Sequence, residues 1–351
     1  MSSECSRCTV APKYNIENCR LFIGIGADHL YEKVSRLLKK TGVKFVPYKR
    51  HLTAEIESLE AFVEAVDNTN VLSSVEMNDI YILPVQTDEA PDYGSFVDSR
   101  SLQYWSILYK NKDIVDVIEN EGIKTWFQPI LRASNLEPFG HEALSRAFTK
   151  CGKQVPTEDL FKVSKKLDLL YNLDRQCRLS SIKNAASFDH FTGKLFINFI
   201  PTVIYDPTVC LRTTHAVAEK TSLKAQDIVF EVVESEFVED YSHLAKILEH
   251  YRSKGYQTAL DDVGSGFSTY SKYEILKTDY IKIDRSVIEN IQDSKANQVY
   301  LDHAIDLKKK TGVKVIAEGI ETPEEYEYVK DTGVDFVQGY YFAKPNDKPL
   351  L

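Results

Sequence analysis

Carboxylate and carboxamide side chains stand at or near the ends of successive short apolar runs after Lys124 in this 351-residue sequence: Glu142, Asn198, Glu231, Glu234, Asp261, Asp262 and Glu318. Acids gathered in one place repel each other strongly unless a cation neutralises them. An all-oxygen set of this kind suits Mg²⁺ or Mn²⁺, and the lack of Cys or His ligands counts against a dedicated zinc site. The adjacent acids Asp261 and Asp262 are able to serve two metal ions ~3.5–4 Å apart, the spacing used for in-line phosphoryl displacement.

Two cationic residues extend this chemistry. Lys282 lies within the apolar run Ile281–Ile283, where it could orient an attacking water or neutralise charge that develops on a phosphate. Arg146, four residues after Glu142, offers a guanidinium fork for a phosphate. A single acid at a strand end more often caps a helix or meets a surface lysine, and that reading is preferred for Glu142 or Glu318 taken alone. Recurrence of acids at successive runs, including an adjacent pair, favours a metal site.

The elements that must position these residues alternate between strand-like runs and helical patterns. The runs typical of strands are Trp126–Ile130, Leu195–Ile200, Ile228–Val233, Thr258–Leu260, Tyr280–Ile283, Val313–Ala317 and Phe336–Phe342. The helical patterns include Glu158–Asn172, His215–Ser222, Tyr241–Lys254, Val299–Lys310 and Pro323–Thr332. This α/β alternation predicts a TIM-like (β/α)8 barrel, whose usual length is ~250 residues and whose C-terminal strand ends meet on one face. The structural alternative is an open, doubly wound sheet.

Residues 1–120 predict a separate, smaller α/β or α+β domain of regulatory or sensory character, and residues 121–351 the barrel. Strands are expected at Leu21–Ile25, Phe45–Tyr48 and Ile80–Val85, and helices at Tyr31–Lys40 and Ala54–Val66. The apolar stripe of Leu102–Asn120 predicts a further helix, which either connects the two domains or contributes to a dimer, or else packs on its own domain.

The amino-acid composition excludes several classes of protein and of binding partner. A hydrophobic share of 43% and a charged share of 27% exclude a mainly disordered, collagen-like or coiled-coil chain. The formal charge of −9 disfavours a nucleic-acid polymer or an anionic membrane surface as partner. No run approaches the ~20 apolar residues of a membrane span, and residues 1–20 lack a signal-peptide core, so a cytoplasmic protein is expected. Cys5, Cys8 and Cys19 are interpreted as reduced thiols, with a metal site as the alternative.

The second domain resembles the EAL-domain family, which hydrolyses the bacterial second messenger cyclic di-GMP. Five motifs carry the resemblance, and they occur in the same order along the chain as in that family. His141–Arg146 (HEALSR) resembles the family signature, and Asp261–Ser268 (DDVGSGFS) resembles its acidic-pair loop. Further matches are IKIDRS at 281–286, AEGIET at 317–322 and QGYYF at 338–342. The resemblance covers about Trp126 to Pro345 and implies a barrel with one reversed strand, a requirement for Mg²⁺ or Mn²⁺, and a homodimer.

The resemblance also implies roles for the matching residues. One metal would be held by Glu142, Asn198, Glu231 and Asp261, and the second by Asp261, Asp262 and Glu318. Lys282 would orient the attacking water, Glu318 is also a candidate general base, and Gln338 would support the water network. Arg146 would hold a substrate phosphate, and Glu321 would contact substrate or support the site. Glu234 would anchor the loop after Asp262, which couples dimer contacts to metal binding.

The predicted function is metal-dependent hydrolysis of cyclic di-GMP to linear pGpG, regulated by the N-terminal domain. Ca²⁺ is expected to inhibit because it prefers a larger and looser coordination shell. The alternative is a receptor that binds cyclic di-GMP without hydrolysing it and signals to a protein partner; a third hypothesis is an interaction module with the barrel as scaffold. Some members of the resembled family have become receptors by losing metal ligands, and every expected ligand is retained here, which favours the enzyme.

Overall fold

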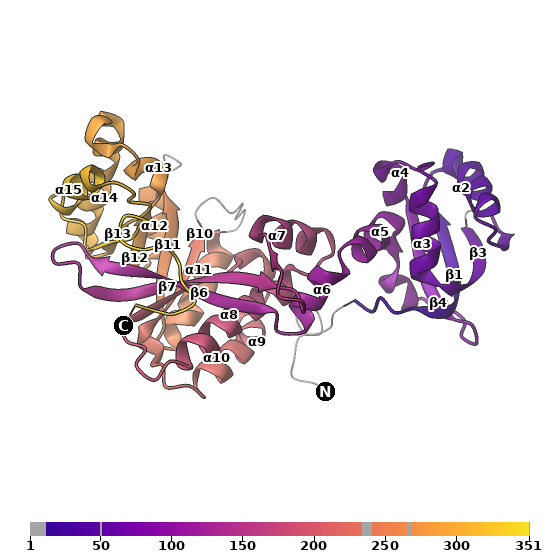
Figure 1. Cartoon of the computed structure of the whole chain (residues 1–351), viewed down its shortest axis with the longest axis horizontal. Helices are drawn as coiled ribbons and strands as arrows, with labels where there is room; N and C mark the ends of the chain where they lie inside the picture. The colour runs from indigo at the N-terminus through magenta and orange to yellow at the C-terminus, as the bar shows by residue number, and fades with distance from the viewer. Residues whose placement is uncertain (1–11, 50, 234–240, 265–268, 351) are drawn as a thin grey trace. The chain divides into compact units, whose positions relative to one another are not determined.

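The computed structural model describes residues 12–49, 51–233, 241–264 and 269–350, which form two compact units (Figure 1). The smaller unit contains residues 12–119 together with Glu158–Leu169, and the larger contains Asn120–Thr157 and residues 170–350. Within the described segments, no helix combines the length and the apolar character needed to cross a membrane.

The smaller unit is built on an antiparallel sheet whose described strands follow the order β2-β3-β1-β4-β5. The strands are β1 (Glu17–Ile25), β2 (Phe45–Pro47), β3 (His51–Ser58), β4 (Ile80–Gln86) and β5 (Arg100–Ser101). The helices are α2 (Asp28–Lys40), α3 (Leu59–Asn68), α4 (Ser74–Asn78), η1 (Ser95–Asp98), α5 (Leu102–Lys110), α6 (Lys112–Glu119) and α7 (Thr157–Lys166). Alternate residues of β1 are buried, and Cys19 is one of them, with burial raising the pKa of its thiol to about 11. Cys5 and Cys8 lie outside the described residues.

The expectation of a helix over Ala54–Val66 is wrong in its first part. Residues 51–58 form strand β3, in which Leu52 and Ala54 are buried and Glu55 and Glu57 are exposed, and helix α3 begins only at Leu59. Ser58 sets this boundary, because its side chain accepts a hydrogen bond from the backbone nitrogen of Ala61 and so caps the helix. The apolar spacing of the segment fits both a strand and a helix. Pairing with β1 makes residues 51–58 a strand, and the Ser58 cap marks where the helix begins.

Two other expected helices are interrupted. Leu102–Asn120 is divided at Asn111 into α5 and α6, and Asn111 donates its side-chain amide back to the carbonyl of Ile107 at 2.7 Å. Glu158–Asn172 is divided after Lys166, where Asp168 takes a left-handed backbone conformation with φ 57°. A residue in that conformation ends a right-handed helix, so the next helix starts afresh at Leu170.

The larger unit is a closed barrel, which rules out the open-sheet alternative. Among the described residues, β6, β7 and β9–β14 form its eight strands, and β8 pairs with the outer end of β7. Their bounds are β6 (Ile123–Arg132), β7 (Pro138–Phe148), β8 (Gln154–Val155), β9 (Lys194–Asn198), β10 (Ile228–Val233), β11 (Gln257–Val263), β12 (Tyr280–Ile283), β13 (Lys314–Ala317) and β14 (Phe336–Val337). Only β6 runs antiparallel to both of its barrel neighbours, so the expected barrel with one reversed strand is confirmed.

Helices and short 3-10 turns connect these strands: α8 (Leu170–Ala186), η2 (Pro201–Val203), α9 (Pro207–Cys210), α10 (Arg212–Ala218), η3 (Ala225–Asp227), α11 (Tyr241–Ser253), α12 (Thr269–Leu276), α13 (Arg285–Ile288), η4 (Ile291–Asp293), α14 (Lys295–Thr311) and α15 (Pro323–Lys330). Strand β7 and helix α8 were not among the expected elements. Glu142 interrupts the apolar pattern of β7 on the face that lines the polar site, and His141, on the opposite face, packs against Phe127 and Phe191.

An apolar layer fills the barrel at the end where the parallel strands begin. It consists of the buried side chains of Ile130, Phe196, Val229, Ala259, Tyr280, Ile316 and Phe336, with Phe139 stacked on Phe336 at 3.7 Å between ring centres. Inward-facing layers of this kind close the lumen of a (β/α)8 barrel. The opposite end of the lumen, at the C-terminal ends of the parallel strands, is left for polar side chains.

Candidate metal centre

The polar residues of the barrel follow the apolar layer at a fixed spacing. Side chains on a strand alternate between two faces, so the residue two positions beyond an inward-facing one also faces inward. Two positions after six of the layer residues stand Asn198, Glu231, Asp261, Lys282, Glu318 and Gln338. On the reversed strand β6 the same step runs backward, from Ile130 to Gln128, and Gln128 pairs with Glu142 of β7. Strand alternation therefore places all of these side chains together at the C-terminal end of the parallel strands.

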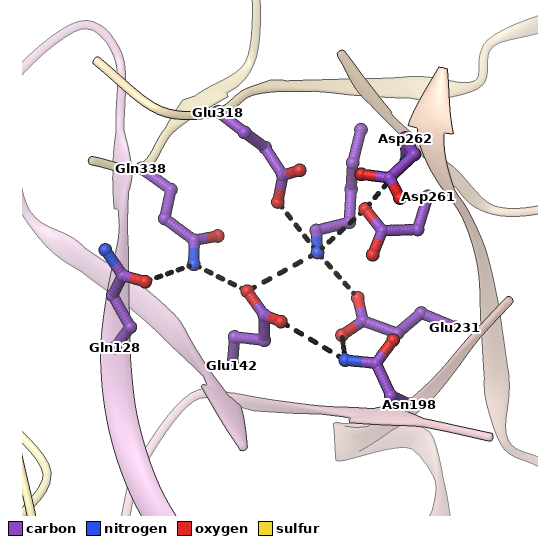
Figure 2. A network of polar contacts seen from close by, with 9 residues as sticks. Gln128, Glu142, Asn198, Glu231, Asp261, Asp262, Glu318 and Gln338 are labelled. Carbon is purple, nitrogen blue, oxygen red and sulfur yellow. Dashed lines mark hydrogen bonds and ion pairs between the residues drawn. The ribbon is translucent and has the colours of Figure 1, made fainter. Parts of the chain in front are cut away.

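The Lys282 ammonium lies within ion-pair distance of four acids that Figure 2 labels: Glu142, Glu231, Asp261 and Glu318. Its ammonium nitrogen is 2.7 Å from Glu318 Oε1, 3.0 Å from Glu231 Oε2, 3.1 Å from Asp261 Oδ1 and 3.5 Å from Glu142 Oε2. Only 1% of Lys282 is exposed, so these ion pairs lie in a largely dry environment. One ammonium therefore serves four carboxylates.

Two overlapping groups of acids are close enough to share a cation. Carboxylate oxygens of Glu142, Glu231 and Asp261 lie within 4.8 Å of one another, and so do those of Asp261, Asp262 and Glu318. Asp261 belongs to both groups, so it is placed to bridge two ions. The donor atoms are carboxylate oxygens throughout, which matches the preference of Mg²⁺ and Mn²⁺.

The backbone at the acidic pair explains how two consecutive acids reach the same mouth. Asp262 has a left-handed conformation with φ 53°, and the pairing of β11 with β12 shifts its register between Leu260 and Val263. A bulge of this kind re-aims a side chain that regular alternation would point away. The backbone nitrogen of Asp262 also donates to Asp261 Oδ1 at 3.0 Å, which fixes the turn.

The charges in the site are unbalanced toward the negative. Burial raises the pKa of Glu231 well above its usual range, with Lys282 opposing this effect and Glu142 adding to it; burial raises the pKa of Glu318 in the same way. Burial also raises the pKa of Asp262 to about 6, and the charge of Asp261 acts in the same direction. For Lys282, burial acts to lower the pKa, but the surrounding acids outweigh it and hold that pKa well above its ordinary value. A site with this excess of negative charge is suited to divalent cations.

Two side-chain amides hold the first group of acids in place. Asn198 donates from Nδ2 to Glu231 Oε1 at 2.9 Å and to Glu142 Oε1 at 3.2 Å. Gln338 donates from Nε2 to Glu142 Oε2 at 2.7 Å, while its buried Oε1 has no hydrogen-bond partner among the described residues. That free acceptor faces the site, where a water or a substrate hydroxyl would satisfy it.

Gln128 belongs to this network but is absent from the residues singled out in the sequence. Its Oε1 accepts a hydrogen bond from Gln338 Nε2 at 3.3 Å, and its Nε2 donates to the carbonyl of Ala343 at 3.3 Å. The signal that could have found it is a buried amide in the otherwise apolar run Trp126–Ile130, two residues from Ile130.

The loop that follows β13 is held tightly against its neighbours. Gly319 has φ 67°, and a Cβ atom there would lie 2.5 Å from Arg285 Cβ. Arg285 donates from Nη1 to the carbonyl of Gly319 at 2.9 Å and pairs with Glu321 Oε1 at 2.5 Å. The loop that carries Glu318 is thereby tied to the end of β12, close to Lys282.

The remaining predicted site residues lie at other places. Arg146 is on β7, four residues beyond Glu142, with its guanidinium 5.3 Å from the centre of the Trp126 ring. Glu321 is 41% exposed at its side chain and is engaged by Arg285, which fits support of the loop. Glu234 lies outside the described residues.

Comparisons with known proteins agree with the motifs. A family model described as "EAL domain" matches residues 111–345. The probable cyclic di-GMP phosphodiesterase PdeG of Escherichia coli K12 is 29% identical over 234 residues, which are 65% of this chain and 45% of PdeG. The cyclic di-GMP phosphodiesterase PdeA of Borreliella burgdorferi is 27% identical over 250 residues, 68% of this chain and 37% of PdeA. This chain thus spans less than half the length of these two relatives.

A solved structure of an EAL protein also resembles this chain. A standalone versatile EAL protein from Vibrio cholerae O395, in its c-di-GMP-bound form, has 36% sequence identity and a TM-score of 0.57. The match covers 64% of this chain and 92% of that one.

Proposed function

This chain belongs to the EAL-domain family, and we propose that it hydrolyses cyclic di-GMP to linear pGpG with the help of two divalent cations. The observation that carries the proposal is the pair of carboxylate groups that share Asp261 on either side of Lys282. A receptor needs no such arrangement, whereas hydrolysis of a phosphodiester requires charge stabilisation on both sides of the phosphorus.

The residues present fit Mg²⁺ or Mn²⁺. Glu142, Asn198, Glu231 and Asp261 would hold one ion, and Asp261, Asp262 and Glu318 the other. When bound, such ions polarise phosphoryl oxygens and stabilise charge on the attacking and leaving oxygens of an in-line displacement.

Side chains of the chain itself would guide the water and its proton. Water forms a new bond to phosphorus while the bond from phosphorus to the ribose 3′ oxygen breaks. Lys282, which already contacts four acids, would hold the water in line and offset negative charge on the phosphate. Glu318 would accept the proton of the water, since its Oε1 lies 2.7 Å from the Lys282 ammonium that would hold this water, and the ribose 3′ oxygen would take up a proton from solvent and leave as a hydroxyl. Gln338 would steady the water through its unpartnered Oε1.

The rest of the chain would bind and regulate. Arg146 would hold a phosphate of the substrate, and Glu321 would support the loop of Glu318 through Arg285. We further propose that residues 1–120 regulate the barrel and that the active form is a homodimer.

The direct test is turnover by the full chain. Cyclic di-GMP is incubated with the protein and Mg²⁺ or Mn²⁺, and pGpG is followed by anion-exchange chromatography. Conversion that stops on addition of EDTA supports the proposal. Absence of turnover by folded protein at every concentration of either ion would refute it, and tight binding of cyclic di-GMP in that case would indicate a receptor.

Calcium provides a second arm of this test. Ca²⁺ takes more ligands at longer distances than Mg²⁺, so its substitution into a compact acidic site distorts the arrangement. We expect Ca²⁺ in excess over Mg²⁺ to suppress pGpG formation. An unchanged rate would contradict the proposed use of these carboxylates.

A further inference from the structure

Strands β6 and β7 continue past the rim of the barrel as a two-stranded ribbon (Figure 1). Pairing between β7 and β9 ends at Ala143, whereas pairing between β6 and β7 continues as far as Ala147 and Ile123. At ~3.3 Å per residue, Arg146 stands about 13 Å along the strand from Glu142. The ribbon therefore forms a wall beside the candidate metal centre.

Lys124, Trp126 and Arg146 lie on the face of this wall that looks toward the barrel mouth. Gln128 pairs with Glu142 and points into the site, and residues two and four positions away on the same strand share its face. Lys124 pairs directly with Arg146, so their side chains are cross-strand neighbours on that face. The wall thus carries two adjacent cations.

Both cations are held by aromatic rings. The Arg146 guanidinium lies 5.3 Å from the centre of the Trp126 ring, and its Nη1 donates to the carbonyl of Ser145 at 2.9 Å. The Lys124 ammonium lies 5.2 Å from the centre of the Phe148 ring. Among the residues that the structure describes, neither cation forms an ion pair with a carboxylate. Two positive charges without anionic partners, on a wall beside a strongly acidic site, are suited to an anionic part of a ligand.

Arg146 already holds a substrate phosphate in the proposed function; we infer that this is the second phosphate, the one that is not cleaved, that Lys124 clamps it together with Arg146, and that Trp126 positions Arg146 for this contact. The inference rests on the proposed function, because cyclic di-GMP carries two phosphodiester groups and the metal centre engages one of them. Lys124 is then a binding residue, and Trp126 is a positioning residue that acts through Arg146. The aromatic ring limits the directions in which the guanidinium can point, which reduces the cost of ordering it on binding.

The test compares three variants of the full chain with a matched control. Lys124→Gln removes the second cation, Trp126→Ala removes the ring under Arg146, and Trp126→Phe retains a ring there. Lys153→Gln serves as the control, because it removes the same charge from an exposed residue of the following hairpin turn. KM and kcat are measured with Mg²⁺, and equilibrium binding of cyclic di-GMP is measured with Ca²⁺ in place of Mg²⁺.

We expect Lys124→Gln to raise KM and the dissociation constant on the order of tenfold with little change in kcat. Its binding should also depend less on salt concentration, since one ionic contact is lost. Trp126→Ala should weaken binding about two- to fivefold, and Trp126→Phe should restore most of it. Lys153→Gln should match the wild type.

Two results would overturn the inference while leaving the proposed function intact. One is unchanged binding and salt dependence in Lys124→Gln; the other is an equal loss in Trp126→Phe and Trp126→Ala. Failure of the wild-type chain to bind or hydrolyse cyclic di-GMP is a different outcome, which would refute the proposed function and the inference together.

Discussion

Replacement of Lys282 by methionine removes the only described cation within ion-pair distance of Glu142, Glu231, Asp261 and Glu318. Methionine is similar in length and apolar, so the change deletes the charge while keeping most of the volume. The variant therefore isolates the electrostatic part that Lys282 plays in the metal-free protein.

The expected loss of stability is about 3–5 kcal/mol, the usual cost of removing one partner of a buried ion pair. Lys282 contacts four acids at 2.7–3.5 Å, yet the loss is not four times larger. Glu231 and Glu318 already have raised pKa values, so they take up protons when the ammonium is removed and relieve part of the repulsion. Each unit of pKa shift corresponds to about 1.4 kcal/mol, which sets the scale of that relief.

The free energy of unfolding is measured by chemical denaturation in EDTA and again with Mg²⁺ or Mn²⁺. The ions should recover part of the loss in Lys282→Met, since ligand at 100 times its dissociation constant adds about 2.7 kcal/mol of stability. Lys314→Met is the matched control: Lys314 is on the next strand, is 51% exposed at its side chain, and forms an ion pair with Asp335. It should lose less than about 1 kcal/mol.

A loss in Lys282→Met no greater than in Lys314→Met would refute the electrostatic reasoning. Equal stability gains from Mg²⁺ in Lys282→Met and in a variant that also lacks Glu142 would show that the ions act elsewhere.

Three further predictions concern residues around the site and in the barrel wall. Glu142→Gln should lower pGpG formation by more than about 100-fold, by loss of a metal ligand, while the exposed Glu137→Gln on the same hairpin should not; chromatography of the product distinguishes them. Gly319→Ala should reduce activity at least tenfold, because the new Cβ would meet Arg285. Gly312 has a similar positive φ, but a Cβ there would have no atom within 4 Å. Gly312→Ala should therefore cost only about 1–2 kcal/mol of stability. Burial lowers the pKa of His215 from 6.5 to about 4, so between these pH values the unfolded chain binds a proton that the folded chain does not bind. The contribution of His215 to the free energy of unfolding should therefore be complete above pH 6.5. It should fall by about 1–2 kcal/mol toward pH 4, after allowance for partial exposure. Denaturation of the wild type and of His215→Phe at pH 7 and pH 4.5 tests this, and equal losses in both would contradict it.

The barrel and most of the acidic site were predictable because strand alternation is a local rule. Asp261 and Lys282 follow inward-facing apolar residues by two positions, and that spacing is visible in the sequence. Gln128 follows the same rule in reverse, and it was missed because β7 was not among the expected strands, so the hairpin that reverses β6 was not recognised. The direction of β6 is set by antiparallel pairing with β7, the next strand in the chain, and with the distant β14.

Helix boundaries and side-chain partners were harder to predict from the sequence. Ser58 caps α3, but the same residues up to Ser58 also satisfy the pattern of a strand, and only the sheet that receives β3 decides between them. Likewise, the pairing of Glu321 with Arg285 depends on how two loops pack, and neither residue carries a local sign of it. Roles that depend on packing between loops need the three-dimensional arrangement.

The reversed direction of β6 also decides at which end the polypeptide enters the barrel. In an all-parallel barrel the first strand starts at the floor, remote from the chemistry. Here β6 starts with Ile123 at the end of the barrel where the acids gather and runs past Lys124, Trp126 and Gln128 toward Ile130. If residues 1–120 regulate the barrel as proposed, a displacement of the segment before Ile123 would act first on the strand that carries Lys124 and Gln128, beside the candidate metal centre.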